Sequence, residues 1–347
     1  MEHTISTLLV LGITIIVSFY TGKGVQWIRL PSIIGFMVVG VISGPSIFNI
    51  LNEHLQQNLT FITEMALGFV ALTIGLELSF VSLKKQGMGI VLIILAESLA
   101  AFILVTGAIF LLTRDLPLAL IFGAIAPASA PAGTVAVIQE LRARGNLTKA
   151  LYAVVGFDDG LGIVIFGFAA AFAQTILESQ AGLHTNGFLQ IIAGPLIEVV
   201  LSILVGTAAA LLFCILGRKL ENSRDIFILI VGFIFVTTGL APVLHISLIL
   251  TNMVFGMVVI NTQPHGFSVR IGEELSNLMP LLFILFFTLA GANLHLSALP
   301  SLGFIGIVYV LSRSAGLIGG SRLGGIIGKA DPLVKKWLGL GILSQAG

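Results

Sequence analysis

The chain has 347 residues, of which 57% are hydrophobic and only 10% are charged, and its formal net charge is +1. A soluble protein of this size carries about 25% charged residues, so the composition excludes an ordinary soluble domain. The near-neutral charge gives no sign of nucleic-acid binding, and we expect no nucleic-acid partner. The single cysteine, Cys214, excludes an internal disulfide and a cysteine metal cluster, and we expect no cofactor.

Apolar runs longer than the roughly 18 residues that span a bilayer recur along the whole chain. They predict an all-α polytopic membrane protein with a single transmembrane domain over residues 1–347. No small-residue cleavage site follows the first run, so we expect the first span to be retained. The expected helices cover residues 5–24, 31–48, 59–81, 88–112, 117–140, 148–177, 190–217, 225–244, 246–261, 275–295 and 302–328, and another begins at 333.

Positive charges are concentrated in alternate loops. Of the 17 lysines and arginines, all but Arg114 and Arg313 lie in loops that follow odd-numbered expected helices. Loops rich in lysine and arginine stay in the cytoplasm. We therefore expect a multi-pass protein of the cell (inner) membrane whose N-terminus faces the non-cytoplasmic side.

The chain repeats itself with a shift of 216 residues (249 − 33), which places Ile249 on Ile33 and Asp331 on Asp115. The same shift places "GANLHLSAL" (291–299) on "GLELSFVSL" (75–83). The alternative is chance similarity between apolar helices. An odd number of expected spans separates equivalent points, so the copies face opposite ways, as in many secondary transporters. We assign residues 1–177 to the first repeat, 178–224 to a linker helix and 225–347 to the second repeat.

The repeat also predicts how far the second copy should extend. The first copy ends near residue 177, so its equivalent should end near residue 393 (177 + 216). The chain stops at Gly347, inside the second copy of the 117–140 helix. We expect the intact protein to continue beyond this point.

Four charged residues lie deep inside predicted spans, where ionisable groups are functional candidates. Asp158 and Asp159 follow Lys149 by nine or ten residues, about 15 Å along a helix and close to the midplane of a roughly 30 Å core. Glu97 and Arg313 lie at a similar depth in their own spans. The pattern predicts a site at this level of the bilayer.

The expected helix 117–140 carries signals that break it in the membrane. Pro127 and Pro131 each remove a backbone donor, and Gly133 loosens the same stretch. Free carbonyls at this depth are tolerated only where they line a cavity or are buried in protein. Together with the hydroxyls of Ser129 and Thr134, they would surround a bare cation; the alternative is a simple proline kink without a ligand.

Adjacent carboxylates at such a break suggest an exchange site. Two carboxylates in a low dielectric cannot both ionise cheaply, and either a proton or a hard cation relieves the repulsion. Because each displaces the other, the competition is itself an exchange mechanism. We predict that the cation and the proton bind at Asp159 and Asp158, with Ser129 and Thr134 as further ligands.

Arg313 needs a partner, and the repeat suggests one. The shift of 216 residues places it on Glu97, and residues related by a pseudo-two-fold axis can meet near that axis. We favour an ion pair with Glu97 over one with Asp158. With Glu97 as partner both aspartates can titrate and transport moves charge, whereas pairing with Asp158 leaves only Asp159 and an electroneutral exchange.

Four motifs together resemble the monovalent cation:proton antiporter superfamily, in the branch of bacterial sodium/proton antiporters and potassium efflux systems. They are "RLPSIIGFMVVGVISGP" (29–45), "EMALGFVALTIGLELSFVSLKK" (64–85), "GFDDG" (156–160) and "RSAG" (313–316). The resemblance implies an inverted-repeat antiporter fold with discontinuous crossing helices, and a homodimer whose core moves against a dimerisation domain. It also implies that Asp159 binds the ion while Asp158 assists it or pairs with Arg313, and it places Ser129 and Thr134 by the crossing.

The sequence therefore favours a secondary antiporter that exchanges Na⁺, Li⁺ or K⁺ for protons in the lipid bilayer. The alternatives are a cation channel and an organic-anion symporter of related architecture. The first normally has rings of ligands around a symmetric pore, and the second is disfavoured by bare aspartates. Enzyme motifs such as a nucleophile elbow or a phosphate-binding loop are missing from the sequence, so we do not expect an enzyme.

Overall fold

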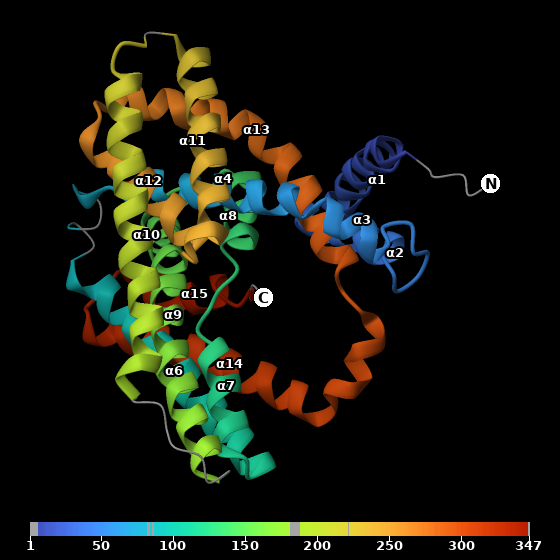
Figure 1. The fold of residues 1–347 in the computed structure, drawn as a ribbon, viewed down its shortest axis with the longest axis vertical. Helices are drawn as coiled ribbons and strands as arrows, with labels where there is room; N and C mark the ends of the chain where they lie inside the picture. Colours follow the sequence, from blue (N-terminus) through green and yellow to red (C-terminus); the bar gives the residue numbers. More distant parts are fainter. Residues whose placement is uncertain (1–5, 82–83, 85–86, 181–187, 221, 346–347) are drawn as a thin grey trace.

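The structure is a computed structural model, and it describes residues 6–81, 84, 87–180, 188–220 and 222–345 (Figure 1). Within these ranges it is helical and contains no strand. Eight of the described helices are long and apolar enough to cross a membrane, which confirms the polytopic helical class. The elements are α1 (Thr7–Trp27), α2 (Ser32–Ser43), α3 (Glu53–Asn58), α4 (Thr60–Glu77), α6 (Met88–Thr113), α7 (Leu116–Ile125), α8 (Pro131–Glu140), α9 (Asn146–Gln180), α10 (Phe188–Gly217), α11 (Ser223–Leu244), α12 (Leu248–Thr262), α13 (His265–Ala292), the 3-10 turn η1 (Leu296–Ala298), α14 (Leu299–Ile327) and α15 (Pro332–Gly341).

The helices depart most from the expected ones in two places. Helix α13 begins at His265, ten residues before the expected start at 275. Its first turns are polar overall, but Phe267, Ile271 and Leu275 are buried at intervals of four residues and anchor one face. The short helix α3 was not predicted; its first turn is capped by the Asn52 side chain, which accepts a hydrogen bond from the Leu55 N–H at 2.8 Å.

The helices form two groups. The scaffold group consists of α1, α2, α4, α11, α12 and α13, and the crossing group of α6, α7, α9, α14 and α15. Helix α8 follows α7 in the chain and lies between the groups, in contact with α9 on one side and with α2, α4 and α13 on the other; we count it with the crossing group because it continues the broken helix that starts with α7. The long helix α10 packs against α9 of one group and α12 of the other. In Figure 1 the scaffold group fills the upper part and most of the crossing group the lower part, with α8 reaching up beside α4.

The bounds of the helices follow the shift of 216 residues. Helix α7 begins at residue 116 and α15 at 332 (116 + 216), and α1 begins at residue 7 and α11 at 223 (7 + 216). The contacts follow it as well, because α2 packs on α13 whereas their equivalents α12 and α4 pack on each other. Helices α6 and α14, which are equivalent, pack on one another.

Glycines make these equivalent contacts possible. A Cβ on Gly40 of α2 would lie 2.9 Å from the Cα of Gly291 in α13, and a Cβ on Gly256 of α12 would lie 3.0 Å from the Cα of Gly75 in α4. Such distances are too short for a side chain, so only glycine lets the backbones approach this closely. The four glycines thus bring the scaffold helices into register.

Candidate functional site

Two interrupted helices meet in the crossing group. Helix α7 ends at Ile125 and α8 begins at Pro131, so residues 126–130 form the break expected in the 117–140 helix. A second non-helical segment, residues 342–345, follows the end of α15 at Gly341. The segments join directly, because the Ala130 N–H donates to the Ser344 carbonyl at 2.8 Å.

Both α7 and α15 are fixed at their outer ends by an aspartate. Asp115 accepts from the Leu118 N–H at 3.0 Å, and Asp331 accepts from the Leu333 N–H at 2.9 Å. The Asn146 side chain also donates to Asp331 at 3.1 Å. This hydrogen bond, together with that from Leu333, lowers the pKa of Asp331 below its usual value. The caps set where each half-helix starts and therefore where it ends at the crossing.

Arg313 of α14 is 4% exposed and reaches both breaks. Its Nε donates to the Ala126 carbonyl at 2.9 Å and its Nη2 to the Ala128 carbonyl at 2.9 Å. Its Nη1 donates to the Leu343 carbonyl at 2.7 Å, and Nη2 also approaches the Ser344 carbonyl at 3.5 Å. The guanidinium therefore satisfies carbonyls that the two broken helices leave without a donor.

The expected ion pair between Arg313 and Glu97 is not formed. Within the part of the chain that the structure describes, no carboxylate lies within 4.0 Å of the guanidinium. The physical reason is the C-terminal ends of α7 and α15, whose free carbonyls carry partial negative charge and present several acceptors at once. The planar fork of an arginine matches such a set of acceptors.

The aspartate pair lies on α9 beside the first break. Asp158 is fully buried, and its Oδ2 accepts a hydrogen bond from the Ser129 hydroxyl at 2.9 Å. The Oδ1 of Asp158 and the Oδ2 of Asp159 are also buried, and neither has a hydrogen-bond partner among the described residues. The structure thus brings Ser129 and Asp158 together, and it leaves acceptor oxygens on both aspartates free.

Thr134 bonds to the crossing and not to the carboxylates. Its hydroxyl donates to the Gly341 carbonyl at 3.1 Å and lies 3.4 Å from the Ser344 hydroxyl. It therefore links α8 to the C-terminal end of α15. Of the two hydroxyl residues predicted for the site, Ser129 contacts the aspartate pair, and Thr134 holds the second broken helix.

Glu97 of α6 adds a third buried carboxyl group. Its side chain is fully buried, its Oε1 accepts from the Ser98 hydroxyl at 3.1 Å, and its Oε2 has no partner among the described residues. The carboxyl groups of Glu97 and Asp158 lie within hydrogen-bonding reach of each other. Sequence reasoning paired Glu97 with Arg313, whereas the structure places it next to Asp158, and no feature of the sequence marks that contact.

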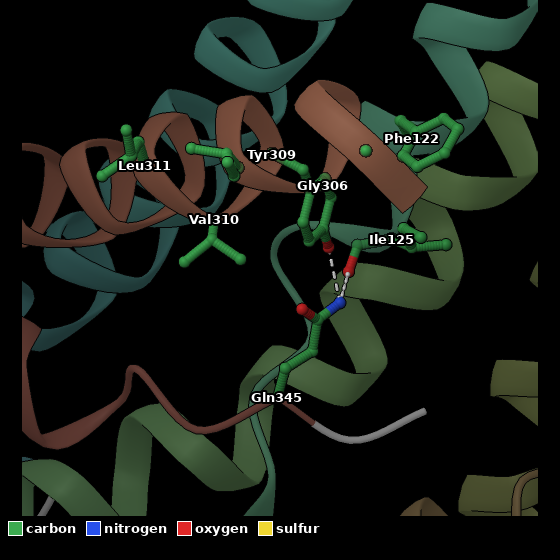
Figure 2. Close-up of a pocket in the computed structure, with 9 residues that line it drawn as sticks. Phe122, Ile125, Gly306, Tyr309, Val310, Leu311 and Gln345 are labelled. Atoms are coloured by element: carbon green, nitrogen blue, oxygen red, sulfur yellow. Dashed lines mark hydrogen bonds between the residues drawn. The ribbon is translucent and has the colours of Figure 1, made fainter. Parts of the chain in front are cut away.

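An apolar cavity of about 550 Å³ flanks the crossing between α7 and α14 (Figure 2). Phe122 and Ile125 line one side and Tyr309 and Val310 another. The Gln345 side chain also lines the cavity and donates to the Tyr309 hydroxyl at 2.5 Å and to the Ile125 carbonyl at 3.3 Å. These groups fix the second non-helical segment against α7, and sequence analysis did not single them out.

The comparisons with known proteins identify the family. Residues 12–344 match the model of the family described as sodium/hydrogen exchanger, transmembrane. The chain belongs to the sodium/hydrogen exchanger family. This assignment confirms the resemblance drawn from the sequence motifs and makes the protein a multi-pass membrane transporter.

Solved structures share the fold. The structure of the sodium proton antiporter MjNhaP1 from Methanocaldococcus jannaschii at pH 8 is 19% identical to the chain, covers 97% of it and 83% of its own length, and superposes with a TM-score of 0.71. A three-dimensional electron-microscopy map of the same antiporter is 18% identical, covers 96% of the chain and 82% of its own, and gives a TM-score of 0.73. Among curated proteins, none matches the sequence significantly. The likeness confirms the antiporter fold with discontinuous crossing helices.

Proposed function

We propose that this exchanger carries a monovalent cation, Na⁺, Li⁺ or K⁺, in one direction and protons in the other, by competition at Asp158 and Asp159. The observation that carries the proposal is the pair of buried oxygens on these residues, Asp158 Oδ1 and Asp159 Oδ2, to which no hydroxyl, amide or main-chain N–H donates among the described residues; the Glu97 carboxyl group beside Asp158 is itself an acceptor unless it carries a proton. A buried carboxylate without a partner is costly. A proton or a cation removes that cost, and one excludes the other.

The surroundings suit a small cation that has lost its water. The Ser129 hydroxyl already contacts Asp158, and its oxygen can turn a lone pair toward a bound ion. Residues 126–130 lie outside any helix, so their main chain can supply carbonyl oxygens besides those of Ala126 and Ala128, which accept from Arg313, and that of Ala130, which accepts from the Thr134 N–H at 3.4 Å. Arg313 engages carbonyls and leaves both aspartates unpaired, which supports a cycle in which both can exchange protons.

We further propose that residues 1–177 and 225–347 are inverted repeats joined by a linker at 178–224. The matching helix bounds and the exchanged contacts of α2, α4, α12 and α13 support this division. An inverted repeat allows one site to face either side of the membrane when one group of helices moves against the other. The homodimer implied by the family resemblance stays a prediction.

The test is proton flux in liposomes that hold the protein and a trapped pH indicator. Addition of Na⁺ or K⁺ under an imposed proton gradient should drive proton movement, and the preferred cation names the substrate. Asp159→Asn should reduce the flux to the level of empty vesicles, whereas Asp225→Asn, an exposed carboxylate at the start of α11, should leave it unchanged. Undiminished flux in Asp159→Asn would place the carrier elsewhere.

A binding measurement separates loss of transport from loss of the site. A cation that binds only the folded protein stabilises it and raises its unfolding temperature. When the cation concentration is a hundred times the dissociation constant, the free energy of unfolding rises by about 2.7 kcal/mol. The wild-type protein should show this shift with its transported cation, and Asp159→Asn should not. An equal shift in both proteins would contradict a cation site at Asp159.

A further inference from the structure

Glu140 connects the two groups of helices at the end of α8. Its Oε1 accepts hydrogen bonds from the Gln26 side chain at 2.9 Å and from the Ser32 N–H at 3.1 Å, and its Oε2 lies 3.0 Å from the same N–H. Gln26 also donates to the Ser32 hydroxyl at 2.8 Å. Gln26 lies on α1 and Ser32 begins α2, so the carboxylate of a crossing-group helix is held by two scaffold helices.

The charge of Glu140 is unfavourable at the C-terminal end of α8 but favourable at the N-terminal end of α2. Glu140 is the last residue of α8, where the negative end of the helix dipole disfavours a carboxylate. Ser32 is the first residue of α2, where free N–H groups attract one, and Pro31 before it offers no side-chain cap. The start of α2 thus offsets the unfavourable position of the carboxylate at the end of α8.

The other end of α8 lies at the site. Ala130, which precedes the helix, bonds to the second broken segment, and Ser129 bonds to Asp158. Helix α8 has ten residues, about 15 Å, and its buried face leaves it little freedom to bend. Because the start of α8 is tied to the crossing, a displacement of the crossing group pulls on the helix and through it on the contact of Glu140 with α1 and α2.

A cavity of about 490 Å³ lies beside the contact, between α1, α2, α8 and α13. Lys23 and Arg142 lie along it together with Glu140, and Ala136 of α8, which is 2% exposed, lines its wall. The scaffold and the crossing group face each other across this space. Separation at Glu140 would widen it.

We propose that Glu140 is a latch that fastens α8 to the start of α2 and opens and closes once in each exchange cycle. The inference rests on the proposed antiport, because exposure of Asp159 to both sides requires the groups to move. Hydrogen bonds of 2.9–3.1 Å are lost when their atoms separate by more than about 0.5 Å, so this contact cannot persist through such a movement. Glu140 is a positioning residue, since it acts on the site through α8.

A reversible cross-link tests the latch in liposomes. Ser32→Cys and Glu140→Cys are combined in a Cys214→Ala background, which removes the only native thiol. A short, cleavable bifunctional thiol reagent is used because the contact runs through the whole glutamate side chain, which is longer than a direct disulfide. The reagent should join the pair and reduce cation-driven proton flux at least about tenfold, and cleavage by a reductant should restore it; each single variant should keep its flux in the reagent. Full flux in the cross-linked protein, or failure of the pair to cross-link, would overturn the proposal.

A second measurement does not depend on transport. The rate at which a thiol reagent labels Ala136→Cys in the same background reports how open the cavity is. Glu140→Ala should raise this rate about tenfold, equivalent to about 1.4 kcal/mol of lost preference for the latched state. Asp225→Asn, the matched control, should not change it, and equal rates in all three proteins would refute the latch even if the antiport proposal holds. If Glu140→Ala speeds the labelling of Ala136→Cys but the protein with intact Glu140 shows no cation-driven proton flux, the latch stands and the antiport proposal is rejected.

Discussion

Arg313 is a permanently charged side chain whose hydrogen bonds all go to main-chain carbonyls of the two breaks. A lone guanidinium at this depth would be expensive. The C-terminal ends of α7 and α15 compensate it, because each presents free carbonyls with partial negative charge. Arg313 therefore holds the crossing together and forms no ion pair with either of the aspartates beside it.

The role of Arg313 predicts a large effect on stability. Arg313→Met should leave the carbonyls of Ala126, Ala128 and Leu343 without donors, and each unsatisfied buried group costs about 1–3 kcal/mol. We expect the midpoint of thermal unfolding in detergent to fall by about 6–12 °C. The midpoint should fall by less for Arg313→Lys, because an ammonium group keeps the charge but cannot reach all the carbonyls at once.

The control for this comparison lies on the same helix. Arg322 of α14 is exposed, so Arg322→Met should change the unfolding midpoint little. Equal losses for Arg313→Met and Arg322→Met would show that the carbonyl contacts contribute nothing to the crossing.

At the level of helices, the fold depends on backbones that pack without side chains between them. Gly256 of α12 faces the main chain of α4, where an added Cβ would lie 2.5 Å from the Leu72 carbonyl oxygen and 2.9 Å from the Leu76 nitrogen. Backbone atoms cannot move aside as a flexible side chain does. The pairing of α4 with α12 thus depends on this glycine, and the pairing of α2 with α13 depends in the same way on Gly40 and Gly291.

Substitution of Gly256 should therefore destabilise the scaffold group. Gly256→Ala forces α4 and α12 apart, an overpacking that costs about 1–3 kcal/mol. A Cβ added to Gly107 of α6 would meet no atom within 4 Å, so Gly107→Ala should be neutral or slightly stabilising. Thermal unfolding of both variants measures the difference, and equal midpoints would contradict the close approach of the two backbones.

For the whole molecule, the charge pattern predicts how the protein lies in the membrane. Two groups of helices face one another; α10 packs on both, α8 and α9 contact scaffold helices directly, and Glu140 bonds to α1 and α2 at one end. The positive-inside rule predicts that the start of α11 lies in the cytoplasm and the end of α13 outside. Glu140 is the last residue of α8, and the loop after it is predicted to lie on the same side of the membrane as the start of α11. The latch would therefore lie on the cytoplasmic face.

Thiol labelling of intact cells tests this orientation. In a Cys214→Ala background, His295→Cys should react with a reagent that cannot cross the membrane. Asn222→Cys should react only after the membrane is permeabilised. Both residues are exposed, so burial does not explain a difference. The opposite pattern would invert the predicted topology, and the Cys214→Ala protein alone supplies the background.

The sequence by itself determined the features that rest on local chemistry. Apolar runs fix the spans because bare backbone polar groups cannot face lipid, and prolines fix the break after Ile125 because they lack an N–H. Asp158 and Asp159 stand out because no structural role compensates two adjacent carboxylates in a span. The prediction placed the start of α13 ten residues too late. The buried residues of its first turns lie on one face of the helix, and the polar residues on the other faces lower the average hydropathy of the segment.

Only the tertiary structure decided which groups meet. Arg313 bonds to carbonyls, Thr134 to the end of α15, Glu97 approaches Asp158, and Glu140 caps α2. Most of these partners are main-chain N–H or carbonyl groups. Because every residue has a carbonyl, the sequence does not show which carbonyls lack a partner within a helix. Two broken helices must first cross, and only then do their unpaired ends select the side chains that satisfy them.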